Sequence, residues 1–566
     1  RTGDNLAKTV ENYLDHSVRR YTKAKSNALA SKAVQEIDNP ALKEYALRYL
    51  DAFNTAADDA VAFKAMRTFA QMWYLAGKLS YGVLNLSSQL TTTWPRLVKD
   101  AGIFSAVRIW TEARTKTMQY HAYRMALMAG KDFSAGIDPE LTGLLDKLER
   151  QNVIQGTFTN ELLDLREGIE TMEGGKLVWE KAKEVGGIIG TMTEKDNRIQ
   201  AAIAGYLAAK NKGLEPLSVM KDYIRGTQWQ YGRQNVPVKM NEFDKVARGG
   251  GKTAWLFQSW VHNYLQMLSS YGRGALHGQE KTANAQAFIT SLGTMGALTG
   301  IKGLPFVALI AAIWTLITGD APDEEFRKAL GTENRRIADT FLYGPASVMT
   351  GIDVSSLAGV GRFPGLNYER LAKTGEIDPD TAIGGLWDRM RRGKEFKDRQ
   401  QYGKMLSEFA PDALRNYLKG SEMEEEGIAR TVRGEALTLG GKTLKVTPEE
   451  ADMRKMGFPP LKVSKAYEEM GHAKLLRSRI SDRQDRYYDM LSAAIAGGDK
   501  ERENKIRNEI AGFNSSAQRH ERIIIDWQTL RNRVKAIRKG RDYKTFPERM
   551  RPELHRRQEL YGETGG

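Results

Sequence analysis

The most apolar stretch of the chain is GLPFVALIAAIWTLITGDAP, residues 303–322, which has no charged side chain between Gly303 and Gly319. Those 17 uncharged positions lie at the short limit of the about 20 residues that a helix needs to cross about 30 Å of hydrocarbon. The stretch therefore predicts a helix that belongs either to a soluble core or to a conditional membrane segment. Whether this helix is part of a soluble core or a conditional membrane segment determines what kind of helical fold the chain adopts.

A second uncharged arm precedes this stretch, because Lys302 is the only charged residue from Thr282 to Gly319. Gly293, Gly296 and Gly300 in that arm favour a close approach between helices. The two arms, joined by IKGLP, predict a helical hairpin that is buried in a soluble form and inserts later. The residues expected to contact lipid are Phe288, Ile289, Leu298, Phe306, Leu309, Ile310, Ile313, Trp314, Leu316 and Ile317.

The composition of the 566 residues indicates a mainly α fold, an elongated assembly of many helices. Hydrophobic residues make up 41% of the chain, which is enough for packed cores, and only 16 prolines interrupt abundant helix-forming residues. One exception is ALTLGGKTLKV, residues 436–446, where apolar and polar residues alternate around two glycines. This alternation predicts one small β-hairpin.

Two threonines are positioned to cap helices. Thr193 precedes a helical pattern that we expect to begin at Glu194, and Thr447 precedes Pro448 and Glu450 in an arrangement typical of a capping box. In contrast, the glycine-dense residues 341–365 predict an ordered loop rather than regular structure.

Changes in composition and in turn signals divide the chain into successive units. They are an N-terminal helical unit (1–135), a helical unit with a charged insert (136–245), aromatic and apolar helices with the candidate membrane hairpin (246–320), a Gly-rich loop and basic helical linker (321–420), a small hairpin-containing segment (421–463) and a C-terminal basic helical unit (464–566).

Motifs for catalysis are missing from the sequence. The chain has no cysteine, its seven histidines are scattered without metal-ligand spacing, and RGGGKTAW at 248–255 lacks the first glycine of a Walker loop. Carboxylate pairs occur at helix starts, where capping explains them. We therefore expect no enzyme, no catalytic residue, no metal and no cofactor.

Basic residues point to a polyanionic or membrane partner, since the formal net charge is +15. Residues 531–557 hold eleven Lys or Arg against three acidic residues, and residues 388–404 form a second basic cluster. The expected contacts to phosphates of DNA or to lipid head groups are Arg531, Arg533, Lys535, Arg538, Lys539, Arg541, Lys544, Arg391 and Arg392. The alternative is a solvated helix face, or pairing with glutamates elsewhere in the chain.

Several segments in this order resemble the C-terminal part of the large polyvalent proteins of bacteriophages and related mobile elements. The segments are LSYGVLNLSSQLTTTWP (79–95), MTEKDNRIQAAIAGY (192–206), YIRGTQWQYGRQNVP (223–237), GLPF (303–306), YGPASVMTGIDVSSLAGVGRFPG (343–365) and MGFPPLKVSKAYE (456–468). The resemblance covers nearly the whole chain, although each motif alone is weak.

The resemblance implies an internal virion protein, packaged in the capsid and ejected through the tail to help form a genome conduit across the host envelope. It also implies a homo-oligomer with other phage ejection, portal or tail proteins, genomic DNA and the host inner membrane as partners. The location changes from the virion interior to the periplasm and inner membrane. The alternative is a nucleic-acid-binding accessory segment of a larger virion-packaged enzyme, a polymerase or cell-wall lyase, with the apolar arms as its core.

Overall fold

The computed structural model places most of the chain between residues 78 and 538, together with helical segments further upstream. The structure describes residues 25, 27–55, 60, 63, 66–67, 69–70, 73–74, 78–131, 138–154, 187–229, 236–248, 250–255, 258–318, 322–330, 334–358, 365–366, 379–380, 382–516 and 522–538.

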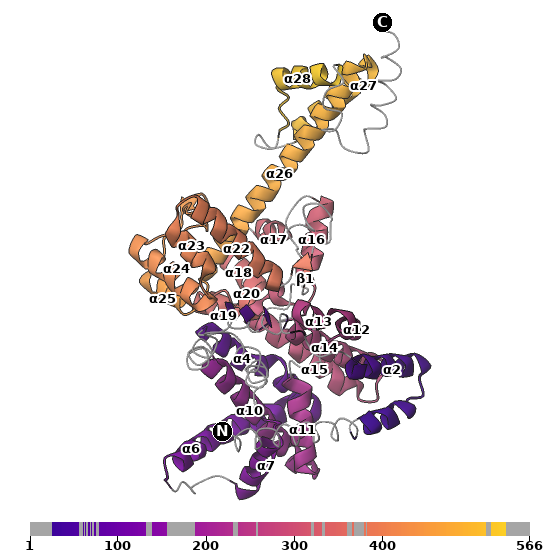
Figure 1. Ribbon diagram of the computed structural model, residues 1–566, viewed down its shortest axis with the longest axis vertical. Coiled ribbons are helices and arrows are strands. Elements are labelled where there is room, and N and C mark those ends of the chain that lie inside the picture. Colours follow the sequence, from indigo (N-terminus) through magenta and orange to yellow (C-terminus); the bar gives the residue numbers. More distant parts are fainter. Residues whose placement is uncertain are drawn as a thin grey trace, which may run out of the picture.

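The molecule is mainly α-helical and elongated, as predicted. Helices of the N-terminal half form one end, a second group of helices lies at the middle, and one long helix, α26, projects from that group toward α27 and α28 (Figure 1). The β-structure among the described residues is limited to short antiparallel strand pairs and isolated bridges.

A helical bundle forms the N-terminal body around the central helix α10. Its members are α4 (Leu79–Thr91), α5 (Thr93–Ala101), α6 (Ile103–Met128), α7 (Pro139–Arg150), α10 (Gly187–Lys212) and α11 (Pro216–Thr227). Leu145, Ile203 and Tyr223 are fully buried in its core. Helices α10 and α11 approach closely at Gly205, where an added Cβ would lie 3.0 Å from the Cα of Met220. Small residues on α10 therefore permit its central position.

Thr193 does not cap α10, so that prediction is wrong. The helix begins at Gly187, about two turns before Glu194, and the Thr193 hydroxyl donates a hydrogen bond to the Gly190 carbonyl at 3.0 Å. A threonine inside a helix commonly bonds the carbonyl of the preceding turn in this way.

Helices α14 (Ser259–His277) and α15 (Lys281–Thr299) pack against each other, and α15 also packs against α4 and α5. Tyr264, Ala287 and Met295 are buried between them. The hydroxyl of Ser291 on α15 donates to the Thr91 carbonyl at 3.1 Å, which ties this layer to the N-terminal bundle.

Three peripheral helices, α2 (Pro40–Thr55), α12 (Val238–Ala247) and α13 (Gly250–Ala254), lie beside this layer (Figure 1). Arg48 on α2 pairs with Glu242 on α12 at 2.9 Å, and Lys245 pairs with Asp51 at 2.6 Å. These contacts at partly exposed positions orient α2 along α12.

The middle of the chain contains short helices between α15 and the first strand pair. They are η2 (Ile301–Gly303), α16 (Val307–Thr318), α17 (Pro322–Leu330), α18 (Arg335–Tyr343), α19 (Pro345–Thr350) and α20 (Val354–Ala358), followed by β1 (Gly365–Leu366) and β2 (Pro379–Asp380). The loop expected over residues 341–365 is thus incorrect for most of its length, because Pro345 starts a helix at its first position.

The remaining helices form a compact group around a small hairpin and then the projecting C-terminal tip. They are α22 (Ala382–Asp398), α23 (Tyr402–Phe409), α24 (Asp412–Glu426), β3 (Thr438–Leu439), β4 (Lys442–Thr443), α25 (Pro448–Lys455), α26 (Leu461–Ala496), α27 (Lys500–Ser516) and α28 (Trp527–Arg538).

The predicted hairpin is confirmed. Thr438 pairs with Thr443 and Leu439 with Lys442, while Gly440 and Gly441 have φ angles of +59° and +77°. Positive φ at both turn residues is what a two-residue type I′ turn requires. The Thr447 capping box at the start of α25 is also confirmed.

Candidate functional site

The two apolar arms occupy different environments, and the first is part of the protein core. On α15, Phe288 packs in the cluster around Tyr264, and Leu298 is half-buried. Ile289 points the other way and is 69% exposed. Most of the first arm is therefore covered by α5 and α14.

The second arm forms α16, the most apolar helix of the protein, and it lies at the surface. Ile310 is 63% exposed, Ile313 43% and Trp314 44%, and Phe306 just before the helix is also exposed. Leu309 is half-buried. The principal neighbours of α16 are η2 and α17 rather than α15. The helix thus presents a large apolar surface to its surroundings, which is unusual outside interaction sites.

Leu316 and Ile317 lie in the last turn of α16, but their side chains fall outside the described residues. Within the part of the chain that the structure describes, no helix is both long and apolar enough to cross a membrane.

A partly buried ionic cluster lies at the turn that precedes α16. Lys302, in the turn between the arms, contacts Glu468 of α26 at 2.6 Å and Asp323 of α17 at 3.0 Å, both through Nζ. Its Nζ also donates to the Tyr343 hydroxyl at 3.2 Å. We call these residues, with Arg327, the Lys302 cluster. The lysine that interrupts the apolar segment thereby joins three distant segments.

Tyr343 completes the cluster. Its hydroxyl accepts a hydrogen bond from Arg327 at 2.9 Å and donates one to Glu468. Burial, and then the charge of Glu468, raise the pKa of Tyr343 although Lys302 opposes the shift, so the hydroxyl remains a donor.

The charges of the cluster favour the ionised forms of its members. Burial opposes the charge of Lys302, but attraction to Glu468 raises the pKa of Lys302 above its ordinary value. Burial likewise opposes ionisation of Asp323, and the charge of Lys302 nevertheless lowers the pKa of that carboxyl. The cluster is therefore a set of matched charges in a poorly hydrated place.

A glycine pair lies next to the cluster. Gly300 ends α15 with φ of +65°, and Gly344 follows α18 with φ of +87°. A Cβ on Gly300 would lie 2.3 Å from the Gly344 nitrogen. Of the three glycines predicted to permit close approach, Gly300 does so, toward the end of α18. Gly293 has no atom within 4 Å of an added Cβ, and Gly296 has only a loose contact with Leu304 at 3.9 Å.

The predicted basic contacts fall into two groups. Arg392 pairs with Glu408 at 3.0 Å, and Arg533 bonds Asp485 and Asp489 at 2.7 Å each, so these two neutralise acidic groups of the protein itself. Arg538 donates to the Ile495 carbonyl at 3.2 Å, and Arg391 lies near Asp388 at 3.5 Å.

Arg531 and Lys535 are exposed one turn apart on α28 and remain available to an anionic partner. Lys539, Arg541 and Lys544 lie outside the described residues.

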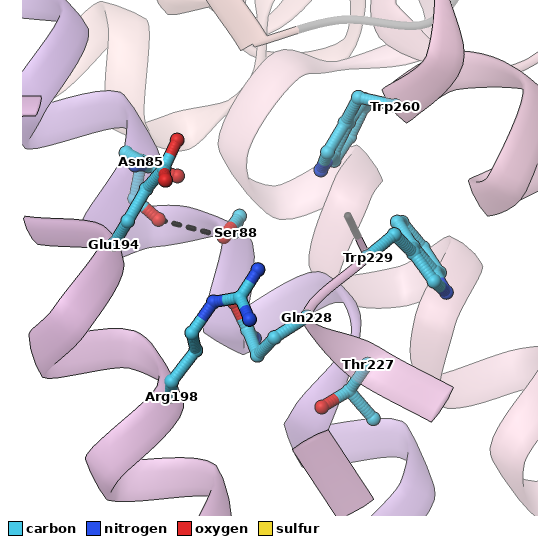
Figure 2. A pocket seen from close by; sticks show the side chains of 8 residues that line it. All are labelled: Asn85, Ser88, Glu194, Arg198, Thr227, Gln228, Trp229 and Trp260. Atoms are coloured by element: carbon cyan, nitrogen blue, oxygen red, sulfur yellow. Dashed lines mark hydrogen bonds between the residues drawn. The ribbon is translucent and has the colours of Figure 1, made fainter. Parts of the chain in front are cut away.

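Figure 2 shows a polar crevice between α4, α10, the end of α11 and α14. Its walls are formed by Asn85, Ser88, Glu194, Arg198, Thr227, Gln228, Trp229 and Trp260. The cavity volume of about 20 Å³ is enough for about one water molecule, so it does not hold a substrate. Among the described residues, no three His, Asp or Glu side chains are grouped to bind a metal ion.

Sequence reasoning missed the Lys302 cluster and a second group of charged residues around α24 and α25. Their members are far apart in the chain, and no periodic signal marks them. Comparisons of the chain with protein-family models, curated proteins and solved structures found no match.

Proposed function

We propose that this chain is a segment of a bacteriophage internal virion protein, which is packaged in the capsid and ejected through the tail to help form a genome conduit across the host envelope. The observation that carries the proposal is the exposed apolar face of α16, formed by Ile310, Ile313 and Trp314. Apolar surface of this kind gains free energy when it is removed from water, as at a lipid surface or another subunit.

The geometry of α16 fits a peripheral contact with lipid. The helix has 12 residues and is therefore about 18 Å long, shorter than the hydrocarbon layer. The Lys302 cluster holds η2, the turn just before α16, to α17 and α26, so the helix reaches lipid while the rest of the protein stays folded. An exposed tryptophan is suited to the membrane interface.

The other parts of the proposal follow from the resemblance and from composition. The chain acts as a homo-oligomer with other ejection, portal or tail proteins, first in the virion interior and then in the periplasm and inner membrane, and it has no catalytic activity of its own. A globule of 566 residues has a radius of gyration of about 24 Å, so passage through a tail channel requires unfolding. The absence of cysteine leaves no cross-link to oppose it.

Flotation with anionic phospholipid vesicles tests the role of α16. We expect the wild-type protein to float with the vesicles and the Ile310→Asp/Ile313→Asp double variant to remain at the bottom, at least tenfold weaker in binding. Two carboxylates would have to enter an apolar interface, at a cost of several kcal/mol.

The matched control is Ile289→Asp, since Ile289 is 69% exposed on α15 and faces away from the core. It should bind vesicles like the wild type. Because Ile310 and Ile313 are exposed, the double variant should keep its circular dichroism spectrum and melting temperature without lipid. Undiminished flotation of the folded double variant would contradict the lipid role of α16, and its unfolding would assign these residues to the core.

A second function, nucleic-acid binding as an accessory segment of a larger virion enzyme, is favoured by the exposed Arg531 and Lys535 on α28. We expect the Arg531→Gln/Lys535→Gln variant to bind duplex DNA more weakly and to reduce the salt dependence of binding by about two phosphate contacts. Titration by fluorescence anisotropy at several salt concentrations measures this. Arg533→Gln is not a suitable control because Arg533 supports α26, whereas the exposed Lys474→Gln is. Equal salt dependence in wild type and variant would exclude a DNA contact at α28.

A further inference from the structure

Positively charged side chains from four helices meet beside the small hairpin domain. They are Lys78 before α4, Arg389 of α22, Arg415 and Lys419 of α24, and Arg454 of α25, here called the cationic cluster. Helices α24 and α25 bring three of them together because α24 has Gly420 at the crossing, where an added Cβ would lie 2.7 Å from the Ala451 carbonyl oxygen.

Too few carboxylates accompany these cations. Asp412 accepts a hydrogen bond from Arg389 at 2.8 Å, and Glu408 accepts one from Arg415 at 2.9 Å. Glu408 is further shared with Arg392. Lys78, Lys419 and Arg454 form no hydrogen bond or ion pair with their side chains in the described part of the chain, and each is only partly exposed. Positive charge is therefore in excess, which is rare in a protein interior without a bound anion.

Hydrogen-bond donors in the same place also lack acceptors. The Arg389 side chain is only 5% exposed, and its Nε, like the Nε of Arg415, is buried without a partner. The hydroxyl of Ser80 in the first turn of α4 is buried and unpaired as well. Buried guanidinium and hydroxyl groups are nearly always satisfied, so these donors indicate a missing acceptor.

The first turn of α4 belongs to the same site. A Cβ on Gly457 would lie 2.8 Å from Ser80 Oγ, 3.1 Å from Lys78 Cγ and 3.2 Å from Asn416 Nδ2. Glycine at this position, with φ of +93°, lets α4 approach α24 and α25. Lys78 and Ser80 are thereby directed to the helices that carry Arg415, Lys419 and Arg454.

Burial and the neighbouring cations both disfavour the charged forms of these groups. Burial, followed by the charges of Arg415 and Arg454, lowers the pKa of Lys419 to about 7, against the opposing effect of Glu408 and Glu422. Burial and then Arg415 lower the pKa of Arg454, and burial lowers the pKa of Lys78. Groups whose charged forms are disfavoured in this way are stabilised by an added anion.

We propose that the cationic cluster binds a phosphate dianion, as free phosphate or as the terminal phosphate of a small monoester. A tetrahedral dianion supplies several acceptor oxygens and two negative charges, which match the excess cations and the unpaired donors. Lys78, Lys419 and Arg454 are each partly exposed, so a small ion can reach the cluster from solvent. This site is separate from α16 and independent of the proposed role in ejection.

Thermal unfolding and titration calorimetry with inorganic phosphate test the site in the full chain at pH 7. We expect phosphate to raise the melting temperature above that in chloride of equal ionic strength, because a ligand that binds the folded state stabilises it. Calorimetry should show binding that the Lys419→Met/Arg454→Met variant weakens at least tenfold. The exposed Lys474→Met is the matched control and should keep the full response.

The double variant also reports whether the site is structural. Without phosphate it should melt at a higher temperature than the wild type, since two mutually repelling cations have been removed. Higher intrinsic stability together with loss of the phosphate response supports the site. A wild-type protein with equal melting temperatures in phosphate and chloride, or a folded variant with undiminished phosphate binding, would overturn the proposal.

Competition distinguishes the two sources of phosphate. If adenosine 5′-monophosphate displaces inorganic phosphate, the site accepts a terminal phosphate on a larger molecule. If the nucleotide does not compete while phosphate binds, the site is specific for the free ion. Either result supports the phosphate site and identifies its occupant.

Discussion

Replacing Gly344 with alanine is expected to destabilise the fold around α15 and α18 by about 3–5 kcal/mol. The φ of +87° at Gly344 is unfavourable for any residue with a Cβ, and the new Cβ would lie 2.6 Å from the Gly300 nitrogen and 2.9 Å from the Leu298 carbonyl carbon. Both neighbours are backbone atoms that cannot rotate away. The strain of the dihedral and the cost of overpacking therefore add.

Gly351→Ala separates these two contributions. Gly351 also has a positive φ, +71°, but no atom lies within 4 Å of an added Cβ, so only the dihedral cost of about 1 kcal/mol applies. Hydrogen–deuterium exchange of α15 and α18, with urea unfolding as a second measure, compares the variants. Equal protection in both variants would show that the Gly300–Gly344 approach contributes nothing.

Replacing Lys302 with methionine should cost about 3 kcal/mol of folding free energy. The methionine fills similar space but removes the cation in direct contact with Glu468 and Asp323, and breaking a buried pair from one side costs about 3–5 kcal/mol. We expect the lower end because the Lys302 side chain is 21% exposed. The exposed Lys474→Met on α26 controls for loss of a lysine and should change stability by less than about 0.5 kcal/mol.

Acid titration gives this prediction a second readout. The pKa of Asp323 is lowered in the folded protein, so its contribution to stability is present above the ordinary carboxyl pKa of about 4 and is lost as the pH falls through the folded-state value. The variant lacks Lys302, the cation that lowers this pKa most, although Arg327 remains. Its stability deficit relative to the wild type should therefore shrink below about pH 4; a deficit that is constant with pH would contradict an electrostatic origin.

Local features of the fold could be predicted from the sequence because short-range chemistry determines them. The hairpin at Gly440 and Gly441 and the capping box at Thr447 depend on residues within a few positions of one another. The prediction that Thr193 caps a helix was wrong because a threonine is equally compatible with a cap and with the interior of a helix that begins earlier. The prediction of a loop over 341–365 failed because Gly344 and Gly351 lie between short helices rather than within a loop.

The candidate sites depend on contacts that no local pattern encodes. Every position of α16 is apolar or small, so its sequence has no polar face that would show which side meets solvent. Lys302 binds Glu468, which lies 166 residues further along the chain. Arg454 lies close to Lys78 although the two are far apart in the chain. Only packing of the whole chain brings such groups together.

Because α26 is long, a small change of its tilt at the base produces a large displacement of its far end. From Glu468, held at its base by Lys302, to Ala496 at its far end the helix rises about 42 Å. A tilt of about 10° at the base would therefore displace the far end, with α27 and α28 attached to it, by about 7 Å. A small change at the Lys302–Glu468 contact, just before α16, that tilts α26 would therefore move the exposed basic residues on α28 by a much larger distance.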